Sequence, residues 1–295
     1  MELIDGKKIA AEIKEELKQA VAELIKKGKN VPGLVTILVG DNPASESYVK
    51  SKAKSSLEIG MRSKIEKLSA DTSEAELIKL IEKYNHDKDY HGILVQLPAP
   101  KHINENNVID VISPKKDVDG LHPVSVGNLV IGKVTLAPCT PAGIQELLIR
   151  YGIETKGRHV VVIGRSNLVG KPIANIMLQK KEGANAVVTI CHSAAKDLAQ
   201  YTRQADILIA AIGSPYFVKE DMVKDGVVVI DVGINRIEDA TKPKGYRIVG
   251  DVDFDNVAPK SSFITPVPGG VGLMTVAMLL KNTLKAYTLY GEKNG

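Results

Sequence analysis

The sequence predicts an α/β fold of two domains, and three observations support this prediction. Its 295 residues, 44% of them apolar, can bury a large core and suggest two domains rather than one. Short apolar runs typical of buried strands alternate with amphipathic segments along the chain. Glycines follow several of these runs, as in the turns at the carboxyl ends of parallel strands, where ligands bind.

Composition restricts the partners that we expect. The apolar runs are too short to cross a bilayer and the amino terminus lacks a signal-peptide core, which favours a cytoplasmic protein that makes no membrane contact. Cys139 and Cys191 are too few for a disulfide framework and lack metal-site spacing, so we expect two reduced structural thiols and no metal. The net charge of +4 and 4% aromatic content argue against nucleic acid but suit a phosphorylated cofactor.

The amino-terminal part of the chain alternates between predicted helices and strands. An amphipathic helix is expected between Gly6 and Gly28, because apolar residues recur there at helical spacing. Capping by Asp71 or Thr72 is expected to start a later helix. The elements that follow the first helix are predicted as a strand over 34–39, a helix over 43–59, a strand over 61–68, a helix over 72–84, a strand over 92–96 and a helix over 106–112.

The predicted helix over 43–59 carries a candidate reactive pair. Asn42 can cap this helix, and Tyr48 and Lys52 lie one turn apart on a face of small polar groups. Because the helix follows a buried strand, the pair should reach the ligand-binding rim of the sheet. Taken alone, such a pair is more often a surface lysine beside a half-buried tyrosine. The buried stripe of the helix is expected to consist of Val49, Ala53 and Leu57.

Two later segments bring polar side chains to the same rim. Gln96 ends an apolar strand just before a proline, so it should lie near Lys52, although a loop amide that caps backbone groups is the alternative. Asp117 and Asp119 lie in a Lys-Asp-Val-Asp-Gly turn whose spacing fails that of a calcium loop. Their carboxylates serve either turn hydrogen bonds or a ligand rich in donors.

After the proline-rich segment near residue 140, the pattern becomes that of a nucleotide-binding fold. Thr140 should cap a helix at the crossing between domains. A strand over 159–163 then leads into a glycine turn over 164–170 and another helix. Backbone N–H groups and the helix dipole in such a turn can hold a pyrophosphate. The turn departs from G-x-G-x-x-G, because Ser166 replaces the second glycine and Gly170 comes one position late.

The next predicted strand, over 186–190, indicates which dinucleotide fits. An NAD-specific fold carries an acid near its end for the ribose 2′-hydroxyl, and no acid is present here. Arg165 in the turn and Ser193 after the strand suit a 2′-phosphate instead, which favours NADP. The alternative for His192 and Ser193 is an ordinary polar loop.

Two further apolar runs, over 205–213 and 226–235, complete the alternation. Ile234 is either a contact of the nicotinamide ring or part of the core, and Asp231 is expected to be structural. The loop over 264–272, rich in proline and glycine, is expected to shape a ligand pocket. The helix after it should return to the first domain.

Seven motifs in order carry a family resemblance over nearly the whole chain. They are Asn42-Pro-Ala-Ser with Tyr48-x-x-x-Lys52, Gly-Ile-Leu-Val-Gln-Leu-Pro, Lys-Asp-Val-Asp-Gly, Pro-Cys-Thr-Pro, Val-Ile-Gly-Arg-Ser, Asp-Val-Gly-Ile-Asn and Pro-Val-Pro-Gly-Gly-Val-Gly. In this order they resemble the bifunctional methylenetetrahydrofolate dehydrogenase/cyclohydrolase family. A single motif can arise by chance, but seven in sequence are specific.

The resemblance implies an architecture and an activity. Two three-layer α/β domains would flank a cleft: a folate-binding catalytic domain, residues 1–140 plus 272–295, and a Rossmann-like NADP domain, residues 141–271. The enzyme would oxidise 5,10-methylenetetrahydrofolate with NADP and hydrolyse the 5,10-methenyl product to 10-formyltetrahydrofolate, in the one-carbon metabolism that serves purine biosynthesis. A homodimer, formed through the nucleotide domain, is also implied.

The resemblance assigns roles to residues of both domains. Lys52 would transfer protons in the hydrolysis, oriented by Gln96 and ordered by Tyr48, while Asp119 would accept hydrogen bonds from the pterin. Leu273 departs from many relatives, which have proline there, and this affects the rigidity of the loop. The folate wall would be formed by Pro268, Gly269 and Gly270, and the NADP site by Gly164, Arg165, Ser166, Ser193 and Ile234.

Two other classes of protein are disfavoured. A short-chain dehydrogenase also uses Tyr-x-x-x-Lys, but in that family the pair follows the nucleotide turn, whereas Lys52 precedes Gly164 here. A non-catalytic nucleotide sensor should have lost Lys52 or the Gly-Arg-Ser turn, and both are intact.

Overall fold

The computed structural model describes residues 1–242 and 245–291, and their contacts divide the chain into two compact units. The six-stranded unit comprises Met1–Ala10 and Thr140–Thr275, and the three-stranded unit comprises Ala11–Cys139 and Val276–Gly295. Each unit is therefore assembled from segments far apart in sequence. Residues 1–10 belong with the six-stranded unit, which differs from the expected grouping of residues 1–140.

A short edge strand explains this difference at the amino terminus. Strand β1 (Glu2–Leu3) pairs in parallel with β11 (Ser261–Ile264), and Ile4 N donates a hydrogen bond to Ile264 O at 2.9 Å. Neither strand was expected from the sequence. Two residues are too few to show a periodicity, and the proline- and glycine-rich loop that follows residues 261–264 gives the stronger sequence signal in this region. Helix α1 (Gly6–Lys26) follows β1 and continues into the three-stranded unit.

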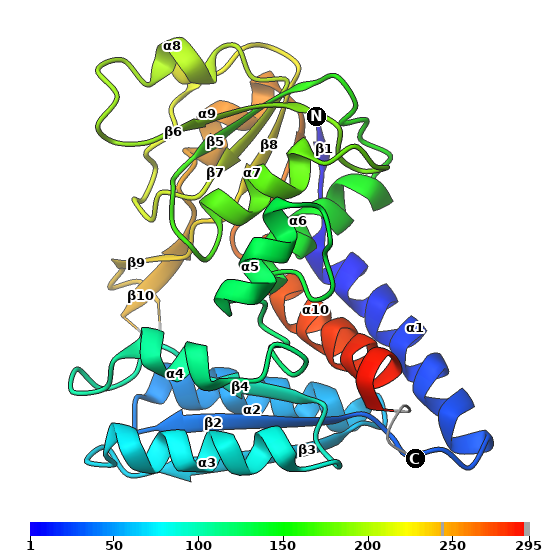
Figure 1. The fold of residues 1–295 in the computed structure, drawn as a ribbon. Helices are drawn as coiled ribbons and strands as arrows, with labels where there is room; N and C mark the ends of the chain where they lie inside the picture. Colours follow the sequence, from blue (N-terminus) through cyan, green and yellow to red (C-terminus); the bar gives the residue numbers. More distant parts are fainter. Residues whose placement is uncertain (243–244, 292–295) are drawn as a thin grey trace. The chain divides into compact units, whose positions relative to one another are not determined.

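The three-stranded unit is a parallel sheet of order β3-β2-β4. Its centre, β2 (Gly33–Val39), is buried at every residue, as its continuous apolar run predicted. The outer strands are β3 (Arg62–Leu68) and β4 (Gly92–Val95). Helices α2 (Pro43–Glu58) and α3 (Glu74–His86) lie on opposite sides of this sheet (Figure 1).

The apolar core on the α3 side of this sheet joins alternate residues of the strands to the helix. Val35, Ile37 and Ile93 pack there with Leu77 and Ile81 of α3. Because successive strand residues point to opposite faces, the remaining residues of β2 face the other helix layer. The unit is completed by α4 (Glu105–Val111), α5 (Pro123–Val130), the greater part of α10 (Val271–Ala286) and a π-helical turn, Tyr287–Gly291.

The six-stranded unit is a parallel sheet of order β1-β11-β8-β7-β5-β6. After β5 (His159–Ile163) the chain forms β6 (Val187–Cys191) on one side and then β7 (Ile207–Ala210) on the other. The strand order therefore reverses between β5 and β7, which is the switch point where doubly wound sheets bind ligands. Strand β8 (Val227–Asp231) lies beyond β7.

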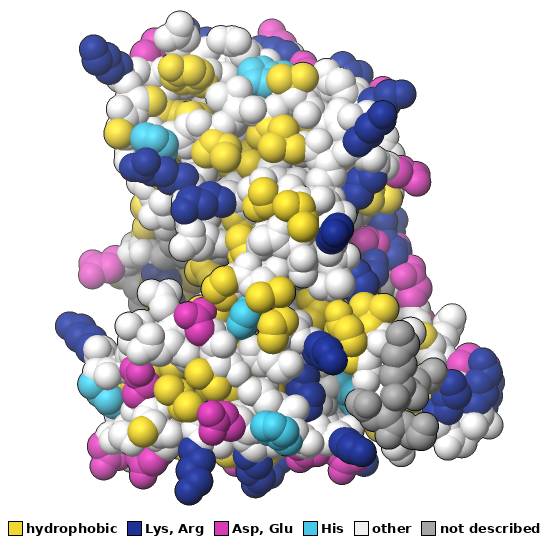
Figure 2. Space-filling model, in the orientation of Figure 1, with side chains coloured by type: hydrophobic (Ala, Val, Ile, Leu, Met, Phe, Trp, Pro, Cys, Tyr) yellow, Lys and Arg dark blue, Asp and Glu magenta, His cyan; other side chains and the backbone are white. Residues whose placement is uncertain are grey.

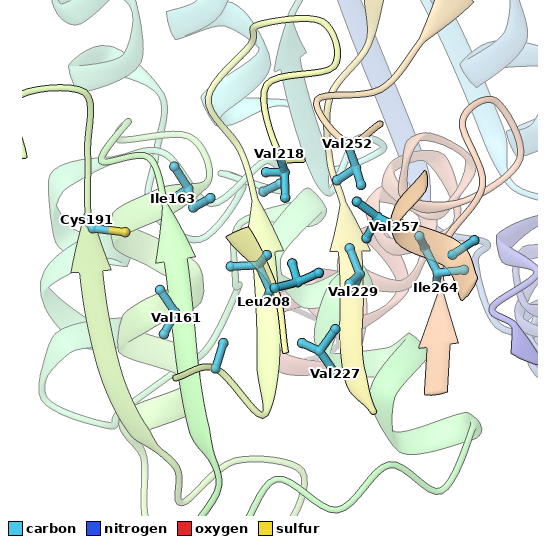
Figure 3. Close-up of a cluster of buried hydrophobic side chains, with 14 residues drawn as sticks. Val161, Ile163, Cys191, Leu208, Val218, Val227, Val229, Val252, Val257 and Ile264 are labelled. Atoms are coloured by element: carbon cyan, nitrogen blue, oxygen red, sulfur yellow. The ribbon is translucent and has the colours of Figure 1, made fainter. Parts of the chain in front are cut away.

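Helices cover the six-stranded sheet, and a small hairpin extends from it. One face packs a cluster of valine, isoleucine and leucine side chains against the segment around α9 (Phe254–Val257), as Figure 3 shows. The hairpin pairs β9 (Asn235–Glu238) with β10 (Tyr246–Val249) in antiparallel register. The other elements are α6 (Cys139–Arg150), α7 (Gly170–Leu178), α8 (Ala199–Thr202) and the 3₁₀ turns Glu220–Met222 and Ala258–Lys260.

Three local expectations were wrong. Leu57 is 61% exposed, because the buried face of α2 consists of Val49 and Ala53 with small serines instead. Helix α3 is capped by Ser73, not by Asp71 or Thr72, because Ser73 and Glu76 form a reciprocal capping box. Helix α6 begins at Cys139, so Thr140 lies inside it rather than at its cap.

The surface carries charges of both signs. Basic and acidic side chains are interspersed over the visible face, without a large region of one sign (Figure 2). Within residues 1–242 and 245–291, no helix is both long and apolar enough to span a membrane.

Candidate active site

Helix α2 carries Tyr48 and Lys52 from the carboxyl end of the central strand β2. Asn42 Oδ1 accepts hydrogen bonds from Ala44 N at 3.0 Å and Ser45 N at 3.2 Å, which satisfies two N–H groups of the first turn. Tyr48 is half exposed, whereas Lys52 is partly buried. The helix thus holds one aromatic ring and one amine at the rim of the sheet.

Gln96 holds the Lys52 amine. Lys52 Nζ donates a hydrogen bond to Gln96 Oε1 at 2.9 Å. At the other end of the amide, Nε2 donates to Leu97 O at 2.7 Å, which directs the oxygen toward the lysine. Gln96 N also donates to Ile37 O at 2.8 Å, so the residue is fixed directly after β4 and beside β2. Both alternatives for Gln96 apply, because one end of its amide caps backbone while the other orients Lys52.

The turn that follows residue 116 runs along β4. Ile93 forms a parallel bridge with Asp117, and Ile93 N donates to Lys116 O at 2.9 Å. The buried Asp117 carboxylate accepts hydrogen bonds from Leu121 N at 3.2 Å and His122 N at 2.9 Å. Asp117 therefore closes the turn by the hydrogen bonds expected of a structural carboxylate.

Asp119 lies at the tip of this turn and interacts electrostatically with Lys52. Gly120 follows it with φ of 72°, and a Cβ there would overlap the backbone at Pro138. The close packing of the glycine holds the turn on the segment before α6. As a result, Asp119, Gln96 and Lys52, which are distant in sequence, come together at one edge of the sheet.

Burial and charge shift the pKa values of this group. Burial lowers the pKa of Lys52, while the Asp119 carboxylate acts in the opposite direction. Burial raises the pKa of Asp119, and the Lys52 ammonium opposes that shift. The pair therefore has an amine that loses its proton more readily than an exposed lysine does, which a proton-transfer role requires.

Two residues of this network were not predicted as site residues. Asn282 Nδ2, from α10, donates to Val118 O and Ala137 O, both at 2.8 Å. Cys139 Sγ donates to Val118 O at 3.2 Å, and burial followed by the Asp119 charge raises the pKa of this thiol well above its ordinary value. Together they fix the backbone before Asp119. An asparagine in the last helix gives no motif, so only tertiary contacts reveal it.

The glycine turn of the six-stranded unit lies at the switch point of its sheet. A Cβ at Gly164 would overlap Ala211 O, just after β7, and one at Gly170 would overlap Gly164 O. Only glycines permit this close approach of backbone. Ser166 Oγ accepts a hydrogen bond from Val169 N at 3.1 Å, so the serine organises the start of α7. The turn has the tight backbone geometry that a dinucleotide phosphate requires.

Arg165 and Ser193 follow two paired strands. Ile163 of β5 is in register with Cys191 of β6, and Gly164 N donates to Cys191 O at 2.8 Å. Arg165 and Ser193 each come two residues after this pair, and both are exposed. The sheet thus delivers a guanidinium and a hydroxyl to the same edge. Their contact with a 2′-phosphate remains a prediction.

The other predicted cofactor and folate residues lie in the same six-stranded unit. Ile234 is 53% exposed between β8 and β9, which excludes the alternative of a core residue. The Pro268-Gly269-Gly270 loop packs on the amino-terminal segment, where Lys7 N donates to Gly269 O at 3.1 Å. The role of this loop as a folate wall remains a prediction.

The described part of the chain contains no cluster of three or more His, Cys, Asp or Glu side chains arranged to hold a metal ion.

Comparison with known families agrees with this geometry. The model of the tetrahydrofolate dehydrogenase/cyclohydrolase catalytic domain matches residues 4–119. The model of the tetrahydrofolate dehydrogenase/cyclohydrolase NAD(P)-binding domain matches residues 138–290.

Individual relatives are similar over nearly their whole length. The bifunctional protein FolD of Chlorobium phaeobacteroides is 58% identical over 289 residues, 97% of each chain. The FolD structure from Campylobacter jejuni superposes with a TM-score of 0.92 at 50% identity, covering 98% of this chain and 99% of the other. The Trypanosoma brucei FolD structure, complexed with NADP cofactor and inhibitor, has a TM-score of 0.92 at 40% identity, covering 97% of both chains.

Matches of both domain models, at this identity and coverage, show that the chain belongs to the tetrahydrofolate dehydrogenase/cyclohydrolase family.

Proposed function

We propose that this chain carries out two successive reactions on one folate, with Lys52 as the proton-transfer group of the second. It oxidises 5,10-methylenetetrahydrofolate with NADP and hydrolyses the 5,10-methenyl product to 10-formyltetrahydrofolate. The observation that carries the assignment of Lys52 is its partly buried amine, held 2.9 Å from Gln96 Oε1 and beside Asp119. Family membership supports the pair of activities.

The dehydrogenase reaction needs positioning more than acid–base chemistry. NADP, when bound, accepts the hydride that leaves the one-carbon bridge of the folate. The folate nitrogen lone pairs stabilise the resulting cation, so no strong base is required of the protein. The glycine turn packs closely on backbone at Gly164 and Gly170 and leads from β5 into α7, where backbone N–H groups and the helix dipole can hold a dinucleotide phosphate. Rate enhancement then comes from alignment of the reacting carbons.

The cyclohydrolase reaction requires proton transfers. Water that attacks the methenyl carbon loses a proton, and a ring nitrogen must be released. Burial lowers the pKa of Lys52, and the cationic substrate would favour the neutral amine further. Gln96 would orient this amine through its 2.9 Å hydrogen bond, while Tyr48 would pack on the folate. Asp119 would accept hydrogen bonds from the pterin. Pro268, Gly269 and Gly270 are proposed as the wall of the folate site.

We assign NADP rather than NAD because of the charge and donors after β5 and β6. Arg165 and Ser193 follow paired strand ends, and no acid stands beside Ser193 to bind a ribose 2′-hydroxyl. A guanidinium and a hydroxyl together suit a 2′-phosphate. The Trypanosoma brucei relative, which is complexed with NADP, supports this choice. Ser166 and Ile234 would complete the site.

The sequence-based boundaries remain part of this proposal apart from residues 1–10, although the compact units also group Thr140 and residues 272–275 with the six-stranded unit. Residues 141–271 would form the NADP domain, joined by Met1–Ala10 through β1. Residues 11–140 and 272–295 would form the folate-binding domain. The enzyme would act in the cytoplasm, in the one-carbon supply to purine biosynthesis, without nucleic-acid or membrane partners.

A homodimer through the nucleotide domain is also proposed. Strand β6 ends the six-stranded sheet as described, and its Val187 and Ile190 side chains are 61% and 43% exposed. An edge strand with apolar side chains can pair with a second copy. Val187→Lys should therefore give monomers in sedimentation, whereas Leu3→Lys at the opposite edge should not. A wild-type monomer, or a Val187→Lys dimer, would reject this interface.

The role of Lys52 is tested by separating the two activities. Lys52→Ala should reduce cyclohydrolase turnover by about 10²- to 10⁴-fold, the usual contribution of a positioned acid or base, while much of the dehydrogenase activity remains. The two reactions are followed by absorbance as methenyltetrahydrofolate forms with NADP and as added methenyltetrahydrofolate decays. NAD is tested in parallel.

Two lysines on the same helix provide matched controls. Lys50 and Lys54 are exposed and form surface ion pairs with Glu46 and Glu58, so their alanine variants should retain both activities. Equal loss of both activities in a folded Lys52→Ala enzyme, or loss of neither, would contradict the assignment.

A further inference from the structure

Asp251 is a fully buried carboxylate that binds two loops at once. Its Oδ2 accepts hydrogen bonds from Ile212 N at 2.8 Å and Gly213 N at 2.9 Å. Its Oδ1 accepts from Ser214 N at 3.0 Å and Asn235 Nδ2 at 2.9 Å. Three consecutive backbone amides after β7 and one side chain after β8 therefore converge on one carboxylate.

A second buried carboxylate fixes the position of the first. Asp231 Oδ1 accepts hydrogen bonds from Asp251 N and Gly233 N, both at 2.9 Å, and Oδ2 accepts from Val252 N at 3.0 Å. Asp231 N in turn donates to Thr265 Oγ1 at 2.7 Å. The two aspartates thus form one network that joins the ends of β7 and β8 to the segment after β10.

Close backbone packing supports this network. A Cβ at Gly233 would overlap the Asp251 carboxylate, and a Cβ at Gly250 would overlap the Asp231 carboxylate. Burying two carboxylates costs free energy unless hydrogen bonds compensate, and apolar side chains would fill the same space at lower cost. Carboxylates, unlike apolar side chains, accept hydrogen bonds from several backbone N–H groups at once and so fix the conformation of the loops that carry them.

One of the segments held by Asp251, the loop 212–214, follows β7 and lies at the switch point of the sheet. Ala211, whose carbonyl contacts Gly164 closely enough to exclude a Cβ, directly precedes Ile212. Gly233 and Asn235, each bonded to one of the two carboxylates, flank the exposed Ile234. The network therefore fixes the backbone conformation of the loop 212–214, which lies opposite the glycine turn. It also fixes the backbone on both sides of Ile234, whose side chain is exposed.

We propose that Asp251 is a positioning residue of the cofactor site: it shapes the loops 212–214 and 232–235 without touching the cofactor. The three amides of 212–214 are used by Asp251, so this loop meets the cofactor with its other backbone atoms and side chains. The proposal rests on the assignment of the six-stranded unit as the NADP-binding domain. Its consequence is specific, because only the dehydrogenase reaction uses NADP.

Asp251→Asn tests the proposal with little change of volume. The amide retains one oxygen but gains an NH₂ group, so some of the four donors lose their acceptor. We expect the dissociation constant for NADP, and its KM in the dehydrogenase assay, to rise about tenfold or more. Cyclohydrolase turnover of added methenyltetrahydrofolate, measured without NADP, should stay within about twofold of wild type.

Asp253→Asn is the matched control. Asp253 lies two residues away and pairs with Lys219 at 3.0 Å on the surface, so its replacement should change neither the NADP constants nor the cyclohydrolase. If Asp251→Asn does not fold, Asn235→Ala removes a single donor of the network and should weaken NADP binding in the same selective way.

The outcomes distinguish this proposal from the proposed function. Unchanged NADP affinity in folded Asp251→Asn, or in Asn235→Ala where the first variant fails, overturns the positioning role. Equal loss of NADP binding and cyclohydrolase turnover in a folded variant also overturns it, because that indicates a general structural role. A wild-type enzyme that does not use NADP rejects the assigned cofactor instead.

Discussion

Lys52 shows how burial and one neighbouring charge act on the same amine in opposite directions. Burial lowers its pKa, whereas the Asp119 carboxylate raises it. Gln96 is a neutral hydrogen-bond partner that orients the amine without adding a charge. The balance between burial and Asp119 therefore sets the pH range in which Lys52 can accept a proton.

The effect of Asp119 on this balance gives a prediction for the pH profile. Asp119→Asn removes the charge that raises the pKa of Lys52, so the acidic limb of cyclohydrolase kcat should move to lower pH. Folate KM should also rise, because the carboxylate is the proposed acceptor for the pterin. The measurement is kcat across pH at saturating methenyltetrahydrofolate, after subtraction of uncatalysed hydrolysis.

The exposed Asp110 of α4 provides the control for this profile. Asp110→Asn should leave both the acidic limb of the cyclohydrolase kcat profile and the folate KM unchanged. If this limb stays at its wild-type pH in Asp119→Asn, or moves to higher pH, Lys52 is not the titrating group.

At the scale of the element, strand β4 depends on a neutral histidine before its first residue. His91 Nδ1 accepts a hydrogen bond from Gly33 N at 3.1 Å, at the start of the central strand β2. Its ring packs edge-on against Tyr287, with centroids 4.8 Å apart. Burial, followed by the charge of Lys116, lowers the pKa of His91 from 6.5 to about 4. A protonated ring would lose the acceptor and bury a charge.

This geometry predicts a dependence of stability on pH. Between pH 6.5 and about 4 the unfolded chain binds a proton at His91 that the folded chain does not, so stability falls as pH falls through this window. The loss amounts to at most about 3 kcal/mol. His91→Asn keeps an acceptor for Gly33 N and should flatten this dependence in urea unfolding at each pH.

Neighbouring charges and a second histidine complete the design of this test. Asp87, Asp89 and Arg62 also face His91. The test therefore compares how steeply stability depends on pH in the wild type and in His91→Asn, and does not rest on the slope of either protein alone. His86→Asn, at the exposed end of α3, should keep the wild-type dependence. Identical slopes for wild type and His91→Asn would reject the explanation.

Local signals predicted the elements that form the site well. The central strand, the Asn42 cap and the approach of Gln96 to Lys52 all follow from apolar runs and short-range capping rules. The exposure of Leu57 could not be predicted in this way, because the periodicity of α2 does not reveal that small serines are buried in its place. The Ser73 cap was missed because Asp71, Thr72 and Ser73 are all good caps, and only the reciprocal bond with Glu76 decides.

Residues that act through distant contacts were beyond sequence reasoning. Asn282 bonds Val118 across 164 positions of the chain, and Asp251 bonds Ile212 across 39. Neither lies in a pattern that names its partner. The two-residue strand β1 is similar, since its place is set by the free edge of β11 rather than by its own sequence.

At the scale of the whole molecule, helix α1 is divided between the two compact units: its first turn belongs to the six-stranded unit and the rest to the three-stranded unit. Ile4, just before α1, is fully buried in the six-stranded unit, whereas Ile13, on α1, is almost fully buried in the three-stranded unit. The two isoleucines are close in sequence yet belong to different compact units. Substitution at each position therefore reports on a different unit.

This arrangement predicts that matched core substitutions loosen different sheets. Ile4→Ala and Ile13→Ala should each cost about 2–5 kcal/mol through lost burial and a cavity. In hydrogen exchange followed by mass spectrometry, Ile4→Ala should accelerate exchange in β8 and β11, and Ile13→Ala in β2 and β4. We expect each variant to leave the other sheet near the wild-type rate, because Ile4 and Ile13 belong to different compact units. Uniform acceleration of both sheets by either variant would instead mean that the two units open as a single cooperative structure.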